Sequence, residues 1–222
     1  MIDVFRIILL RDLKVSLRRW SDVFTSLIFF ILVCLIFPLT AGDDQTLLLK
    51  IIGPVMLISA LLATLLSMQS LFKPDVSNGS LEQLVISSYS LAYIVCIKIF
   101  CFWLVTSLPL LLVSGLIAAS YYVDQQSIVI VMLTLIVSTP TFVNIAALAA
   151  ALTVGVRHSG ALMALIIIPL TLPAMIFGSK AIEYSILGFD PTAPLYFLIG
   201  MMIFTSTLGP FVTAAAIRIS ID

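Results

Sequence analysis

Six long apolar runs, none of them interrupted by a charged residue, occupy most of this 222-residue chain. A helix needs about 20 mainly apolar residues to cross the hydrocarbon core of a bilayer, which is roughly 30 Å thick. Each run reaches or approaches that length, so the sequence predicts an all-α integral membrane protein with six transmembrane helices in one domain, residues 1–222. The predicted spans are residues 23–39, 51–72, 99–122, 128–156, 159–179 and 194–217.

The positive residues are distributed unequally between the two sides that six spans define. Both termini, the 73–98 loop and the 157–158 turn fall on one side, whereas Lys50 and Lys180 fall on the other. The first side therefore holds nine of the eleven Lys and Arg residues, namely Arg6, Arg11, Lys14, Arg18, Arg19, Lys73, Lys98, Arg157 and Arg218. Because Lys and Arg are enriched in cytoplasmic loops, we expect both termini in the cytoplasm.

The first apolar run is expected to be retained as a span. It is preceded by 22 residues and is itself 17 residues long, whereas the apolar region of a secretory signal peptide is typically 7–15 residues. The segment before it, residues 2–20, carries apolar side chains at helical spacing. The pattern predicts an amphipathic helix on the cytoplasmic leaflet; the alternative is a loose basic tail. The residues expected to contact the membrane surface are Arg11, Lys14, Arg18, Arg19 and Trp20.

The cytoplasmic loop Lys73–Lys98 is the one substantial polar segment. Ser77, Asn78 and Gly79 form a turn signal, and Ser80 with Gln83 has the spacing of a capping box that begins a helix. This short helix, Ser80–Ser87, is expected either to dock into a groove of a partner or to be an ordinary loop element. The candidate contact residues are Asp75, Gly79, Ser80, Leu81, Glu82, Gln83 and Leu84.

The scarcity of charge excludes several classes of function. Ion-coupled carriers usually need ionisable groups at membrane depth, and none lies in these spans. There is no Gly-x-Ser-x-Gly elbow, no nucleotide-binding Gly-x-x-x-x-Gly-Lys-Ser/Thr motif, and a single histidine, His158. We therefore expect no enzyme activity and no metal site, and the sequence assigns no cofactor-binding residues. Energy for any work is expected from another polypeptide at the cytoplasmic face.

Three further expectations concern packing. The alanines between Ala146 and Ala151 are expected to form a close-packing seam, either within the chain or between two chains. The cysteines at 34, 96 and 101 fit neither a disulfide framework nor a metal site and are expected to be small buried side chains. The 180–193 segment has the length of a short helix or a re-entrant element.

The cytoplasmic loop resembles that of the CcmB family, the permease subunits of a bacterial haem-exporter ABC system in cytochrome c maturation. Phe72 to Asp75 and Gly79 to Leu84 carry the resemblance in this loop, and Gly79 to Leu84 is its most specific part, whereas Lys73 and Pro74 depart from the basic-then-acidic pair more usual in the family. It continues in order along nearly the whole chain, through residues 37–39, 98–112, 139–140, 151–155, 168–178 and 214–220.

The resemblance implies a six-span permease of the bacterial inner membrane that forms a homodimer and recruits a separate ATPase, CcmA. It also implies the partners CcmC, CcmD and the haem chaperone CcmE, with haem as the candidate substrate and no nucleic acid. ATP-driven motion would either move haem or release loaded CcmE from CcmC. The alternatives are a permease of another ABC exporter, for lipid or drug, or a membrane scaffold without transport activity.

Overall fold

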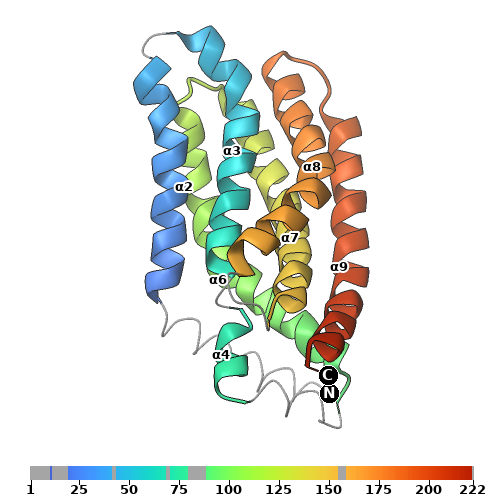
Figure 1. Ribbon diagram of the computed structural model, residues 1–222. Helices are drawn as coiled ribbons and strands as arrows, with labels where there is room; N and C mark the ends of the chain where they lie inside the picture. The colour runs from blue at the N-terminus through green and yellow to red at the C-terminus, as the bar shows by residue number, and fades with distance from the viewer. Residues whose placement is uncertain are drawn as a thin grey trace.

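In the computed structural model, residues 11, 20–41, 44–68, 71–79, 89–154 and 159–221 are described. These residues form helices and no strand. The helices are α2 (Trp20–Ala41), α3 (Gln45–Met68), α4 (Lys73–Ser77), α6 (Leu91–Ala119), α7 (Gln125–Leu152), α8 (Ser159–Ile186) and α9 (Thr192–Ile221). The long helices run side by side as a bundle, and the short α4 lies at one end of it, here called the α4 end (Figure 1).

Six of the described helices are long and apolar enough to cross a membrane, which confirms the predicted all-α membrane fold. More than half of the residues in the spans of α3, α6 and α7 are buried, whereas fewer than a quarter are buried in the spans of α2, α8 and α9. The exposed side chains are largely apolar, among them Leu112, Leu116 and Leu165. Because bilayer hydrocarbon solvates such side chains, this exposure is what a membrane-spanning bundle requires.

Helix α7 is the centre of the bundle and contacts α3, α6, α8 and α9. Its alanine-rich stretch explains how so many helices can approach it, since small side chains bring backbones close together. The alanines at 146, 147, 149, 150 and 151 are all buried within this single chain. The Ala146–Ala151 seam therefore packs inside the chain, which resolves the choice that the sequence left open.

Most polar side chains in the spans are satisfied within their own helix. The hydroxyls of Ser59, Thr64 and Thr106, for example, donate to the carbonyl oxygens of Val55, Ala60 and Phe102. Such bonds are needed because no water is present to satisfy a hydroxyl in hydrocarbon. A smaller set of hydrogen bonds joins different helices: Ser26 with Ser67, Trp103 with Thr139, Asn144 with Ser206, and Ser127 with Ser185.

The connections from α6 to α7 and from α8 to α9, at the end opposite α4, are short. Tyr121, just after α6, donates from its hydroxyl to the carbonyl oxygen of Cys34 in α2, at 2.5 Å. The Asp124 carboxylate caps α7 by accepting from the backbone N–H groups of Gln126 and Ser127, each at 3.1 Å. Helix α8 continues to Ile186, so most of the 180–193 segment belongs to α8 and α9, and residues 187–191 connect them.

None of the three cysteines, all of which lie in the described part of the chain, forms a disulfide bond. Cys34 and Cys101 are buried, as expected, but Cys96 is exposed, and the prediction of a buried side chain was wrong there. Cys96 lies in the apolar helix α6, so its small, weakly polar side chain can face lipid at little cost.

Candidate functional site

A short helical segment, α4, brings a charged residue to the end of the bundle. Leu71 and Phe72, directly before α4, are buried, and Pro74 stands in the first turn of the helix, where its missing N–H costs nothing. The backbone N–H groups of Asp75 and Val76 both donate to the carbonyl oxygen of Phe72, at 3.0 Å. The segment is therefore anchored on its apolar side by residues that belong to the core, and it ends in the turn at Gly79.

Gly79 has a positive φ of 65°, a conformation that glycine adopts without steric cost. A Cβ atom added there would meet nothing within 4 Å. The backbone conformation, rather than crowding, therefore favours glycine at this position. The chain turns here as it leaves α4.

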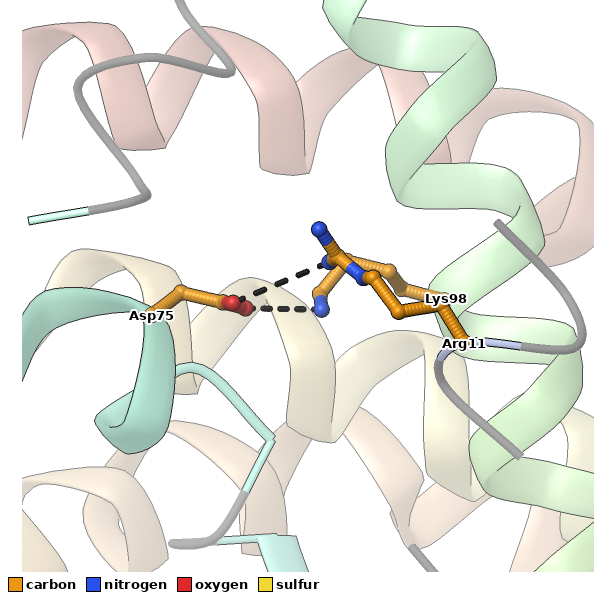
Figure 2. Close-up of polar contacts among 3 residues, drawn as sticks. All are labelled: Arg11, Asp75 and Lys98. Atoms are coloured by element: carbon orange, nitrogen blue, oxygen red, sulfur yellow. Dashed lines mark ion pairs between the residues drawn. The ribbon is translucent and has the colours of Figure 1, made fainter. Parts of the chain in front are cut away.

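The Asp75 carboxylate forms ion pairs with two cations from distant parts of the chain (Figure 2). Its Oδ2 atom lies 2.7 Å from Nζ of Lys98 in α6, and its Oδ1 atom lies 3.8 Å from Nη2 of Arg11. The Asp75 and Lys98 side chains are only 12% and 7% exposed, whereas Arg11 is 45% exposed. One carboxylate therefore connects Arg11, the short helix α4 and the long helix α6.

Because the Asp75 and Lys98 side chains are both largely buried, their ion pair contributes to stability differently from an ion pair at the surface. Lys and Asp are almost never buried unless they are paired, and removing one partner of a buried ion pair costs about 3–5 kcal/mol. The net gain relative to a well-packed apolar pair is small, because desolvation of both charges opposes their attraction. The Asp75–Lys98 pair therefore specifies the position of α4 against α6 more than it stabilises the fold.

A second feature is a partly open groove of about 250 Å³ between α6, α7 and α9. Its lining is almost entirely apolar and includes Phe100, Trp103 and Met202. Asn144 in its wall donates from its amide nitrogen to the carbonyl oxygen of Pro140 at 2.8 Å, and more weakly to Ser206 Oγ at 3.4 Å. Such a lining suits an apolar surface presented from the bilayer and not a charged solute.

The structure describes part of the sequence-predicted site. Asp75 and Gly79 lie in and just after α4, and Arg11 joins the ion cluster. Trp20 begins α2. The other candidates, Lys14, Arg18 and Arg19 and the helix residues Ser80, Leu81, Glu82, Gln83 and Leu84, lie outside the described residues, as does the rest of the predicted interfacial helix.

From the sequence, Lys98 is expected in the loop, directly before a span beginning at Ile99. In the structure, α6 begins at Leu91, and Lys98 stands inside it with apolar side chains on both sides. The signal was present: residues 91–97 are uncharged and mainly apolar. A lone lysine within an apolar stretch implies a buried partner, and the only acidic residues between 73 and 98 are Asp75 and Glu82.

The chain is similar to members of one protein family over nearly its whole length. The family model described as CcmB protein matches residues 3–220. A Pseudomonas aeruginosa protein named heme exporter protein B is 37% identical over 100% of this chain and 99% of its own length. The proteins of the same name from Haemophilus influenzae (38% identical, 99% of each chain) and Escherichia coli (37% identical, 95% of this chain and 96% of the relative) are similarly close.

Proposed function

The chain belongs to the CcmB family, and we propose that this permease subunit of a haem-export ABC transporter is driven by a separate ATPase. The ATPase binds the loop of residues 73–98 on the cytoplasmic side of the bacterial inner membrane. The α4 end of the bundle is the cytoplasmic end, and both termini lie on that side.

The observation that carries this proposal is the position of α4. It is the short, charged element at the end of an otherwise apolar bundle (Figure 1), and it is fixed to the core by Phe72 and by the Asp75–Lys98 pair. A loop held in this way can receive force from a soluble protein. The chain itself contains no nucleotide-binding loop of the Gly-x-x-x-x-Gly-Lys-Ser/Thr type.

The residues that meet the ATPase are those of the capping-box segment. Leu81 and Leu84 fill an apolar groove on the ATPase, and Glu82 pairs with a basic residue there. Burial of each leucine contributes about 2 kcal/mol or more to the interface, so loss of one weakens a modest interface at least about tenfold. Gly79 provides the turn that presents the segment.

Two copies of the chain form the membrane part of the complex, with two copies of the ATPase. The family resemblance supports CcmC-, CcmD- and CcmE-like proteins as further partners and haem as the cargo. Haem iron is held by one or two axial side chains such as His or Met, and the sequence has a single histidine, His158, and no His/Met pair that suits such ligation. This favours a mechanism in which ATP-driven motion releases the loaded chaperone, with haem bound elsewhere in the complex.

The docking proposal is tested with Leu84→Asp and Glu82→Lys in a tagged chain purified from native membranes. Both variants are expected to insert normally and to lose the ATPase from the purified complex. Leu187→Asp is the matched control, because Leu187 is an exposed leucine (59%) in the turn at the opposite end. Retention of the ATPase by both loop variants, with normal cytochrome c maturation, would contradict the proposal.

The stoichiometry has its own test. The mass of the detergent-solubilised complex, measured by light scattering or native mass spectrometry, is expected to contain two copies of this chain. A single copy with its ATPase bound would rule out the dimer and leave the docking segment to be judged by the variants above.

A further inference from the structure

We propose that Asp75 and Lys98 are positioning residues that transmit displacement of the cytoplasmic loop to helix α6. This inference rests on the proposed function, because it needs the ATPase to act on the loop. It identifies the contact through which the docking segment acts on the membrane bundle.

The Asp75–Lys98 pair joins α4 directly to α6. Asp75 lies four residues before Gly79, where the chain turns toward the predicted docking segment, and its carboxylate meets Lys98 at 2.7 Å. Lys98 is the eighth residue of α6, a 29-residue helix that contacts α2, α3, α7 and α9. Movement of α4 therefore acts on a helix that contacts most of the bundle.

The Asp75–Lys98 pair differs in kind from the apolar contacts that hold the start of α4. Apolar packing around Leu71 and Phe72 holds the start of α4 but is not directional. The ion pair between Lys98 and Asp75 joins two specific atoms at a short distance, 2.7 Å, and separating its buried partners leaves a charge poorly solvated. Lys98 is therefore expected to follow Asp75 when the loop is displaced, which a purely apolar contact would not require.

Arg11 is a second cation beside the Asp75 carboxylate. Its guanidinium lies 3.8 Å from the other oxygen of the same carboxylate and is 45% exposed (Figure 2). Arg11 is thus placed to compensate part of the Asp75 charge while Asp75 and Lys98 move together. Arg11 then takes part in the coupling as a second, weaker partner of Asp75.

The test uses Asp75→Asn, Lys98→Met, the charge exchange Asp75→Lys/Lys98→Asp, and Arg11→Gln in the full complex. Three quantities are measured: ATPase copurified, ATP hydrolysed by the complex, and cytochrome c matured in cells. Asp75→Asn and Lys98→Met are expected to retain the ATPase and its hydrolysis but to lower cytochrome c output about tenfold or more. The exchange is expected to restore at least part of that output, and Arg11→Gln to cause a smaller loss.

The matched control is Lys180→Met. Lys180 pairs with Glu183 at the same 2.7 Å, but this pair is exposed and lies within one helix, so it connects nothing. Its loss is expected to leave all three quantities unchanged.

Two outcomes overturn the inference. Normal cytochrome c output from Asp75→Asn and Lys98→Met shows that the pair transmits nothing. Loss of the chain itself from the membrane in both, with full recovery in the uncharged pair Asp75→Asn/Lys98→Met, shows a folding contact only. Failure of the proposed function is seen separately, as retention of the ATPase by Leu84→Asp and Glu82→Lys.

Discussion

Gly53 of α3 lies directly against the backbone of Ser179 in α8. A Cβ atom added at residue 53 would stand 3.1 Å from Ser179 Cα and 3.2 Å from the Ser179 carbonyl oxygen. Because these neighbours are backbone atoms, they cannot rotate away as the end of a flexible side chain can. The contact between α3 and α8 therefore depends on the absence of a side chain at residue 53.

Gly53→Ala is expected to lower the thermal stability of the detergent-solubilised protein, and Gly53→Val to lower it further. Gly200→Ala in α9 is the matched control, because a Cβ atom there would meet nothing within 4 Å. Alanine favours a helix over glycine by about 0.8–1.0 kcal/mol, so the control should be neutral or stabilising. A melting temperature for Gly53→Val at or above the wild-type value would contradict the close approach.

The two adjacent tyrosines after α6 provide a second comparison. Tyr121 is fully buried and donates to the carbonyl oxygen of Cys34, whereas Tyr122 is 58% exposed. Tyr121→Phe should destabilise the protein by about 0.5–1.5 kcal/mol, because the hydrogen bond between α2 and the end of α6 is lost. Tyr122→Phe should leave stability unchanged. Equal unfolding midpoints for the two variants would show that this bond does not hold α2.

The cap of α7 predicts a pH dependence. Hydrogen bonds from Ser127, its side chain first, lower the pKa of Asp124 below its ordinary value of 3.8. A carboxyl group with a lowered folded-state pKa stabilises the protein above its unfolded pKa, and this contribution is lost as the pH falls through the folded value. Unfolding midpoints of the wild type and Asp124→Asn should therefore differ most above the unfolded pKa and converge in stronger acid.

Asp124→Ala tests the same cap without reference to pH. It removes the acceptor of two backbone N–H groups and should cost about 0.5–2 kcal/mol at neutral pH. Asp124→Asn keeps a side-chain acceptor and should cost less. If the alanine variant unfolded no earlier than the asparagine variant, the carboxylate would not be acting as a cap.

The membrane orientation is tested by labelling single cysteines in a cysteine-free chain. Positions 44, 125 and 184 are exposed at the end opposite α4, and position 78 is exposed at the α4 end. In sealed right-side-out vesicles, an impermeant thiol reagent should label cysteines replacing Asp44, Gln125 and Tyr184 but not one replacing Asn78. Labelling of position 78 alone would show that the orientation is the reverse of the one proposed. The α4 end would then not be the face to which the ATPase binds.

The sequence by itself determined the six membrane helices, because uninterrupted apolar runs of this length leave a chain no other way to satisfy its backbone in lipid. It also indicated a packing role for the alanines of α7, since small side chains matter only where helices approach. The span limits were less well predicted. Residues 51–72 were expected to form one span, but α3 runs from Gln45 to Met68, and Leu71 and Phe72 belong to the segment that leads into α4. Hydropathy does not show where a helix ends when the residues that follow it are also apolar and buried.

Only the tertiary structure decided which groups meet. Whether the alanine seam of α7 packs within or between chains depends on the positions of α8 and α9, which no local pattern encodes. Arg11, Asp75 and Lys98 are far apart along the chain, and their meeting at one carboxylate depends on where α4 lies against α6. Hydropathy reports the average environment of a segment, whereas an ion pair depends on the positions of individual atoms contributed by several segments.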